Sequence, residues 1–269
     1  MSEVPRRVRS THLRAMKKRG EKIVMLTAYD AAMARLLDAS GVDVLLVGDS
    51  LGMVVMGCET TLEVTLDAMI HHAKAVSRAV KRALVVADMP FMTYQAGLDE
   101  AVKNAGALLQ KGGAAAVKLE GGRAVVEAVK RMTSVGIPVM GHLGLLPQAV
   151  HQLGGYRKQA TSAAAEEQLM QDASALEEAG AFAVVLESVP DAAARRVTGS
   201  VSIPTIGIGA GPDCDGQVLV IYDILGLSST APPFSKVYFD AGAAVSAAAK
   251  QFAAEVRNGQ FPGREDQRK

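Results

Sequence analysis

The sequence contains no tryptophan, and aromatic residues make up only 4% of its 269 positions. Proteins that hold single-stranded nucleic acid commonly stack bases on aromatic side chains, so this scarcity weighs against such a function. Charges of the two signs nearly cancel, since 29 Lys and Arg face 28 Asp and Glu, for a formal net charge of +1. Nucleic acids and anionic membranes favour a strong basic excess. We therefore expect neither as a partner.

Cysteine and long apolar runs are scarce as well. Cys58 and Cys214 lie far apart and fit no metal-binding spacing. Two thiols are more typical of a reducing compartment than of a disulfide-stapled secreted protein. The first residues, MSEVPRRVRS, lack the apolar segment of a secretory signal, and no stretch approaches the roughly 18 apolar residues of a membrane span. We expect a soluble, cytoplasmic protein.

Short apolar runs alternate with segments of helical periodicity. The runs are KIVMLTAYD, VDVLLVGDS, ALVVADMP, AAAVKLEGG, GIPVMGHLG, AFAVVLESVP and SIPTIGIGAG. They are continuously apolar, which is typical of parallel strands covered on both faces. In residues 61–83 apolar side chains recur at helical spacing, and the intervening His71 and His72 are expected at the surface.

These runs make seven strand–helix units, and GQVLVIYDILG supplies an eighth strand. Eight such units at this length predict an α/β fold, a single-domain (β/α)₈ TIM barrel over residues 1–269, rather than an open doubly wound sheet. We place an N-terminal segment at about residues 1–20 and an extended loop over the barrel mouth at residues 144–167. A C-terminal helix with a polar tail is expected at about residues 239–269.

Four of the apolar runs finish on a carboxylate, at Asp49, Asp88, Glu120 and Glu187. The carboxyl ends of barrel strands gather on one face, so these acids should converge. Several buried carboxylates need a cation or protons to offset their repulsion. Oxygen ligands without a Cys or His cluster suit Mg²⁺ or a similar ion. The alternative is that each acid caps the next helix or lies in a solvated turn.

Two basic residues and a glycine-rich loop complete the candidates. Lys118 and Glu120 are two residues apart on one strand and should face the same way, either as a structural pair or as a site with a cation for substrate oxygens. His142 ends the fifth run, where it could contact a ligand or only a backbone carbonyl. The loop IGIGAGPDCDG has Pro212 where a dinucleotide-binding loop needs its last glycine. We interpret its glycines as serving a tight turn or a close approach to a ligand.

Taken together, the motifs resemble the ketopantoate hydroxymethyltransferase family. The resemblance rests on MLTAYD, LLVGDSLGMVVMG, ADMPF, VKLEGG, GIPVMGHLGLLPQ, LESVP, PTIGIGAG, CDGQVLV and DILGL, which occur in the family's order from about residue 25 to 227. It implies a (β/α)₈ barrel, one Mg²⁺ per subunit and a homodecamer. The implied reaction moves a hydroxymethyl group from 5,10-methylenetetrahydrofolate to 3-methyl-2-oxobutanoate, giving 2-dehydropantoate for pantothenate and coenzyme A.

The same resemblance assigns roles to individual residues. It implies a metal site of Asp49, Asp88 and Glu120, substrate contacts from Ser50 and Lys118, and Glu187 as the catalytic base. We also place Asp49, Asp88 and His142 in the substrate site. Glu120 is expected to act on the metal directly or through water. For the folate, the loop after the fifth strand and IGIGAG are the regions we expect to be involved.

Two other functions are compatible with parts of the sequence. A lyase of the isocitrate lyase and phosphoenolpyruvate mutase group would also be a Mg²⁺ barrel acting on oxo acids, but its Lys-Lys-Cys-Gly-His stretch is missing here. A requirement for folate would separate the two. A non-catalytic barrel that senses a small anion has only IGIGAG in its favour, and binding without turnover or metal dependence would indicate it.

Overall fold

Eight parallel strands close into a barrel in the order β1-β2-β3-β4-β5-β6-β7-β8. This computed structural model describes residues 7–228 and 231–263. The strands are β1 Ile23–Thr27, β2 Val44–Val47, β3 Leu84–Asp88, β4 Ala116–Glu120, β5 Val139–Gly144, β6 Ala183–Glu187, β7 Thr205–Ile208 and β8 Gly216–Leu219. Each predicted apolar run contains one of them, so the TIM barrel fold is confirmed.

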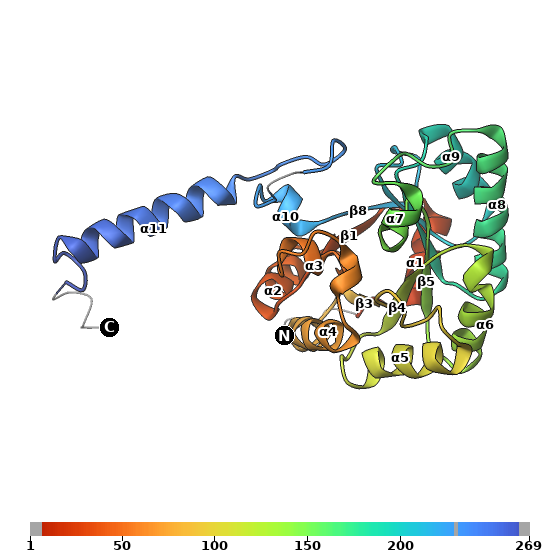
Figure 1. The fold of residues 1–269 in the computed structure, drawn as a ribbon, viewed down its shortest axis with the longest axis horizontal. Coiled ribbons are helices and arrows are strands. Elements are labelled where there is room, and N and C mark those ends of the chain that lie inside the picture. Colours follow the sequence, from red (N-terminus) through yellow and green to blue (C-terminus); the bar gives the residue numbers. More distant parts are fainter. Residues whose placement is uncertain (1–6, 229–230, 264–269) are drawn as a thin grey trace. The chain divides into compact units, whose positions relative to one another are not determined.

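Helices surround these strands (Figure 1). The α-helices of the barrel unit are α1 Ser10–Arg19, α2 Ala31–Ala39, α3 Leu51–Val54, α4 Leu66–Ala79, α5 Leu98–Gln110, α6 Val126–Ser134, α7 Val150–Leu153, α8 Ala163–Glu178 and α9 Asp191–Ser200, with 3₁₀ turns η1 Thr61–Glu63, η2 Arg123–Val125 and η3 Pro147–Ala149. In α4, Met69, Ala73 and Val76 are buried as their spacing predicts. His72 differs from expectation, because its Nδ1 lies 2.6 Å from the carbonyl oxygen of Tyr29 and the ring is half-buried.

The barrel interior is filled by the inward-facing alternate residues of the strands. One apolar cluster comprises Val8, Leu13, Ile23, Met25, Val44, Leu46, Leu84, Val86, Ala116, Met140, Phe182, Ala183, Val185, Ile206 and Val218. Leu13 of α1 is fully buried in it, so the N-terminal helix closes the end of the barrel at which the strands begin. The predicted N-terminal segment is therefore part of the core from Val8 onwards, and residues 1–6 lie outside the described part.

The seventh strand–helix unit was predicted wrongly. Residues 209–215 connect β7 directly to β8 without a helix. Gly209 and Gly211 have φ angles of 61° and 76°, which side-chain-bearing residues rarely adopt, and they permit the tight crossover. A Cβ at Gly216 would lie 2.5 Å from the carbonyl oxygen of Ile23, so glycine also allows β8 to approach β1 closely. The glycine-rich stretch thus serves a turn and strand packing.

The long segment after β5 is more ordered than an extended loop. It contains η3 and α7 before α8 begins at Ala163. Pro147 opens η3, and Gly154 ends α7 with a left-handed φ of 68°. These local signals explain why the chain turns twice within this segment.

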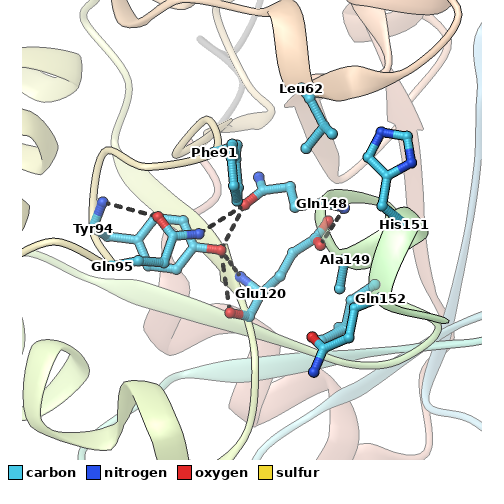
Figure 2. A pocket seen from close by; sticks show the side chains of 10 residues that line it. Leu62, Phe91, Tyr94, Gln95, Glu120, Gln148, Ala149, His151 and Gln152 are labelled. Atoms are coloured by element: carbon cyan, nitrogen blue, oxygen red, sulfur yellow. Dashed lines mark hydrogen bonds between the residues drawn. The ribbon is translucent and has the colours of Figure 1, made fainter.

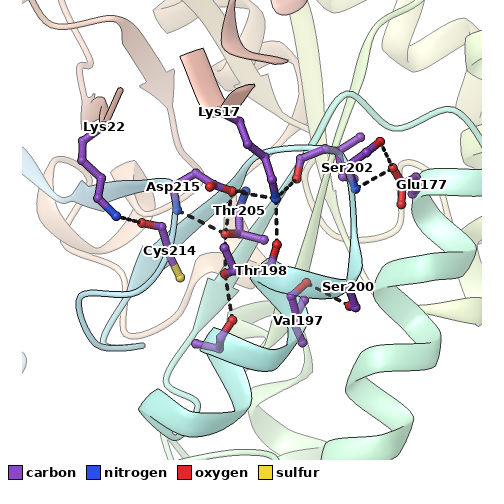
Figure 3. A network of polar contacts seen from close by, with 12 residues as sticks. Lys17, Lys22, Glu177, Val197, Thr198, Ser200, Ser202, Thr205, Cys214 and Asp215 are labelled. Carbon is purple, nitrogen blue, oxygen red and sulfur yellow. Dashed lines mark hydrogen bonds and ion pairs between the residues drawn. The ribbon is translucent and has the colours of Figure 1, made fainter. Parts of the chain in front are cut away.

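A polar network ties α1 to the beginnings of β7 and β8 (Figure 3). Lys17 Nζ lies 3.0 Å from Asp215 Oδ2 and donates hydrogen bonds to the carbonyl oxygens of Thr198 and Ile203. Asp215 Oδ2 also accepts from the backbone N–H of Thr205 at 2.8 Å. The network lies at the end of the barrel opposite the carboxyl termini of the strands.

Residues from Ile221 onwards separate as a second compact unit, which is described by itself. It contains α10 Ile221–Ile224 and α11 Ala241–Arg257. No residue of α11 is buried. The predicted C-terminal helix is therefore α11, and the polar tail at 264–269 lies outside the described residues. In the part of the chain that is described, no helix combines the length and apolar character needed to cross a membrane.

Candidate active site

The inward-facing residues change from apolar to polar at the carboxyl ends of β3 to β6. Asp88 ends β3, Lys118 and Glu120 lie on β4, His142 lies on β5 and Glu187 ends β6. All but Glu187 are buried, with Asp88 only 3% exposed, and the Glu187 side chain is 16% exposed. Because side chains alternate along a strand, the same register that fills the core delivers these groups to one layer. The predicted convergence is confirmed.

Asp49 lies in the loop after β2 and directly contacts the end of β3. Its backbone N–H donates to Asp88 Oδ2 at 3.1 Å. Lys118 Nζ lies 2.7 Å from Asp88 Oδ1, so the lysine pairs with Asp88 and not with Glu120 as its spacing had suggested. A Cβ at Gly48 would lie 2.8 Å from Ser50 Oγ and 3.4 Å from Asp88 Oδ2, which explains the glycine. The half-buried Ser50 shares a hydrogen bond of 2.9 Å with the Tyr29 hydroxyl.

His142 lies between two carboxylates. Its Nδ1 is 3.4 Å from Glu120 Oε1, and its Nε2 is 3.1 Å from Glu187 Oε2. Neither contact has the alignment of a hydrogen bond, so the attraction depends on charge. Ser188, directly after Glu187, has a φ of 50°, a conformation that costs a non-glycine residue free energy and often marks functional sites.

Gln148 was not predicted as a site residue from the sequence, yet it contacts both Asp49 and Glu120. Its Nε2 donates to Asp49 Oδ2 at 2.8 Å and to the carbonyl oxygen of Met89 at 2.9 Å. Its backbone N–H donates to Glu120 Oε2 at 3.0 Å, and its Oε1 accepts from the Tyr94 hydroxyl at 2.7 Å. The only sequence signal was its place in the segment after the fifth strand.

Burial and mutual charge shift the protonation of this layer. Burial, together with the nearby Asp88 and Glu120, raises the pKa of Asp49 well above its usual value. Burial also opposes ionisation of Glu120, but His142, Lys118 and the Gln148 N–H outweigh it and lower the pKa of Glu120. Burial and Lys118 disfavour a charged His142, yet Glu120 and Glu187 raise its pKa to about 9.

Lys118 is a cation held in place by acids. Burial alone would lower the pKa of Lys118, but Asp88, Glu120 and Asp49 raise it above its usual value. With His142 protonated, two positive groups face the carboxylates of Asp49, Asp88, Glu120 and Glu187. The layer therefore has more acidic side chains than basic ones.

This excess and the oxygen donors fit a divalent cation. Asp88 Oδ1 is buried and ion-paired with Lys118 Nζ, and Asp49 lies directly beside Asp88. Among the described residues, no three His, Cys, Asp or Glu side chains form a group that could hold a metal by themselves. The arrangement thus offers two adjacent carboxylates, Asp49 and Asp88. Glu120 is connected to Asp49 through hydrogen bonds that Gln148 donates to both residues.

A pocket of about 300 Å³ adjoins this layer (Figure 2). Its lining comprises Leu62, Phe91, Tyr94, Gln95, Glu120, Leu146, Gln148, Ala149, His151 and Gln152. Half of it comes from the segment after β5, and no residue of the glycine-rich loop takes part. Its volume is at the lower end of the range for small-molecule sites.

Comparison with solved structures shows the fold. The chain resembles a phosphonopyruvate hydrolase complexed with oxalate and Mg²⁺, with a TM-score of 0.62 and 15% identity over 95% of this chain and 89% of that one. It also resembles 2,3-dimethylmalate lyase, a member of the PEP mutase/isocitrate lyase superfamily, with a TM-score of 0.61 and 19% identity over 97% and 89%.

Sequence comparison shows the family. The chain is 58% identical to 3-methyl-2-oxobutanoate hydroxymethyltransferase of Syntrophus aciditrophicus (strain SB), over 96% of this chain and 95% of the relative. It is 56% identical to the enzyme of the same name from Moorella thermoacetica (strain ATCC 39073 / JCM 9320), over 96% and 97%. The family model described as ketopantoate hydroxymethyltransferase matches residues 7–264. The chain therefore belongs to the ketopantoate hydroxymethyltransferase family.

Proposed function

We propose that this enzyme transfers a hydroxymethyl group from 5,10-methylenetetrahydrofolate to 3-methyl-2-oxobutanoate, giving 2-dehydropantoate for pantothenate and coenzyme A synthesis. Family membership supports the overall reaction. The observation that carries the mechanism is the buried layer in which Asp49, Asp88, Lys118 and Glu187 converge at the mouth of the barrel. A 2-oxo acid has oxygens that can bind a cation at one end and an acidic C–H at the other. In such a layer one set of residues can hold the cation while another removes the proton.

Asp49 and Asp88 would hold one Mg²⁺ per subunit, and Glu120 would orient its water ligands. The adjacency of the two buried aspartates supports this assignment. When bound, Mg²⁺ withdraws electron density from a keto group and so stabilises an enolate. Lys118, 2.7 Å from Asp88 Oδ1, would offset the remaining charge of the substrate oxygens, and Ser50 would donate a hydrogen bond to them.

Glu187 would be the base that removes the proton from C3 of the oxo acid. It is the most exposed acid of the layer, and His142 lies 3.1 Å from its Oε2, which orients the carboxylate by charge. The resulting carbon nucleophile attacks the one-carbon unit of the ring-opened folate. Addition of water and release of tetrahydrofolate then give the hydroxymethyl product.

The pocket beside Glu120 is our candidate for the site that binds part of the folate donor. It adjoins the carboxylate layer, and its lining combines Phe91 and Tyr94 with the amides of Gln95 and Gln152. A pterin ring has flat faces for aromatic contact and edges that need amide-like partners. The segment after β5, expected at the sequence level to take part, supplies half of this lining.

The experiment that tests the base is Glu187→Gln, which keeps the size of the side chain and removes its basicity. Exchange of the C3 proton of 3-methyl-2-oxobutanoate with deuterium, followed by NMR with Mg²⁺ and without folate, should slow by about 10²–10⁴-fold. Glu178→Gln on the exposed end of α8 is the matched control and should exchange at the wild-type rate. Wild-type exchange in Glu187→Gln would exclude Glu187 as the base.

The complete reaction needs a separate assay. Purified enzyme with both substrates and Mg²⁺ should form 2-dehydropantoate, and a chelator should stop it. Formation of a cleavage product without folate would instead indicate a lyase.

The enzyme is further proposed to work as a homo-oligomer, a homodecamer by the family resemblance. Helix α11 supports association, because Val245, Phe252 and Val256 are exposed apolar residues on a helix with no buried position. Apolar groups gathered on one exposed helix commonly mark an interface.

A further inference from the structure

We propose that Gln148 is a positioning residue that fixes Asp49 and Glu120 for the cation, an inference that rests on the proposed Mg²⁺-dependent reaction. Gln148 lies in η3, on the segment that covers the barrel mouth after β5, and its side chain is buried. From there it contacts groups in the loops after β2 and β3 and at the end of β4. One residue thus connects the carboxyl ends of four consecutive strands.

The amide of Gln148 can lie in only one orientation. Its Nε2 faces two acceptors, Asp49 Oδ2 at 2.8 Å and the carbonyl oxygen of Met89 at 2.9 Å. Its Oε1 faces two donors, the Tyr94 hydroxyl at 2.7 Å and Gln95 Nε2 at 3.3 Å. A flipped amide would place N–H groups against donors and oxygen against acceptors. All four hydrogen-bonding positions of the amide are therefore used.

Tyr94 fixes the orientation of the Gln148 side-chain amide through a hydrogen bond to its oxygen. Its hydroxyl oxygen accepts from the backbone N–H of Glu120 at 3.1 Å, and its single proton has Gln148 Oε1 at 2.7 Å as a nearer acceptor than the carbonyl oxygen of Glu120 at 3.2 Å. The contacts from Glu120 N–H through the Tyr94 hydroxyl to the Gln148 amide can be followed in Figure 2, and the amide in turn donates to Asp49. Buried networks in which every member is satisfied hold a single geometry.

The consequence concerns which oxygens remain for the cation. The Gln148 side chain holds Asp49 through Oδ2, and the Gln148 backbone N–H holds Glu120 through Oε2. This leaves Asp49 Oδ1 for a cation, while Glu120 Oε1 faces His142 Nδ1 at 3.4 Å. Asp88 differs, because its Oδ2 accepts from the Asp49 N–H and its Oδ1 is paired with Lys118. A ligand carboxylate that is already oriented binds a metal more tightly, and loss of such an outer hydrogen bond typically weakens affinity about 10–100-fold.

The test is Mn²⁺ binding to the metal-free enzyme, measured by calorimetry and by the EPR signal of free Mn²⁺, without either substrate. Gln148→Met keeps the length of the side chain and removes every hydrogen bond of the side-chain amide. The backbone N–H that donates to Glu120 Oε2 remains. We expect its dissociation constant for Mn²⁺ to rise about 10–100-fold. Gln110→Met, at the exposed end of α5, is the matched control and should bind like the wild type. An affinity within about twofold of wild type in Gln148→Met would overturn the proposal.

A second readout separates positioning from a folding defect. Raising the Mn²⁺ concentration should restore C3 proton exchange in Gln148→Met towards the wild-type rate, because Glu187 is untouched. Exchange that stays low at saturating Mn²⁺ would count against a role through the metal ligands. If Gln148→Met does not fold, Tyr94→Phe removes only the hydroxyl that fixes the amide, and its Mn²⁺ affinity should also fall. Unchanged affinity there would overturn the inference.

Failure of the two proposals can be told apart. A wild-type enzyme that binds Mn²⁺ but forms no 2-dehydropantoate would contradict the proposed function and not the role of Gln148. A wild-type enzyme that is active, with a Gln148→Met variant of equal Mn²⁺ affinity, would contradict only the latter.

Discussion

Asp88 contacts both Asp49 and the buried Lys118 of the site. One of its oxygens accepts from the Asp49 N–H, and the other lies 2.7 Å from Lys118 Nζ. A buried lysine without a partner is costly, so Asp88 both holds the cation site and keeps Lys118 charged. The two roles make this carboxylate harder to replace than its neighbours.

Replacing Asp88 with Asn should weaken metal binding strongly. The amide keeps the size of the side chain and an oxygen for the Asp49 N–H, but it removes the negative charge. We expect the Mn²⁺ dissociation constant to rise at least about tenfold, measured by titration calorimetry. Asp99→Asn, on the exposed first turn of α5, is the control. Equal affinities in the two variants would remove Asp88 from the metal site.

The residues of the site could be predicted to different degrees. Asp88, Glu120 and Glu187 could be located because each ends an apolar run and the carboxyl ends of barrel strands meet on one face, and Lys118 because it lies two residues before Glu120 on the same strand. Gln148 could not be found in this way. Its position depends on how the segment after β5 folds over the mouth of the barrel. That path is decided by contacts with the ends of β2, β3 and β4 and not by local periodicity.

At the scale of elements, the ends of β5 and β6 meet unusually closely. Gly144 has a φ of 91°, and a Cβ there would lie 2.2 Å from the carbonyl oxygen of Glu187. The backbone N–H of Leu145 donates to the same oxygen at 2.8 Å. Glycine at this position therefore sets how near the end of β5 comes to the proposed base.

Gly144→Ala should damage catalysis more than its backbone strain alone predicts. An L-residue at such a φ costs about 1–2 kcal/mol, and the clash must also displace Glu187. Because a misplacement of about 1 Å can cost about 10²-fold in rate, we expect C3 proton exchange to fall at least tenfold. Gly136→Ala is the control, since its φ of 86° is similar and nothing lies within 4 Å of the added Cβ. Similar exchange rates in both variants would contradict this account.

Helix α1 and its network at the other end of the barrel serve stability. Lys17 is the centre of this network and pairs with Asp215, and both side chains are mostly buried. The N-terminal face of such barrels supports the fold while the opposite face carries the chemistry. Apolar periodicity predicted the strands that this network joins. It did not predict the missing helix after β7, because the glycines that allow a direct crossover resemble an ordinary loop.

Lys17→Met should therefore destabilise the fold and leave catalysis intact. Loss of hydrogen bonds from a charged group typically costs about 1–3 kcal/mol, which we expect as a lower midpoint of urea unfolding. Arg19→Met, at the end of the same helix, removes the exposed pair with Glu21 and should change the midpoint far less. Equal shifts would show that the buried network adds nothing, and a lower turnover in Lys17→Met would contradict the separation of the two faces.

At the scale of the whole molecule, the sequence of α11 indicates a surface that needs a partner. Ala241, Val245, Ala248, Phe252 and Val256 follow one another at steps of three and four residues and so share one face of the helix. Phe252 is 53% exposed. A helix of this kind is stable in water mainly when its apolar face is packed against something else.

The proposed oligomer can be tested by placing a charge on that face. Burial of a phenylalanine side chain is worth about 1.5–3 kcal/mol, so Phe252→Glu should raise the subunit dissociation constant at least about tenfold. Sedimentation velocity across a range of protein concentrations would show smaller species at concentrations where the wild type remains assembled. Ser246→Glu adds the same charge about one-third of a turn away from the apolar face and should assemble like the wild type. If both variants keep the wild-type distribution, the face of α11 is not an interface, and association of subunits must depend on another surface of the enzyme.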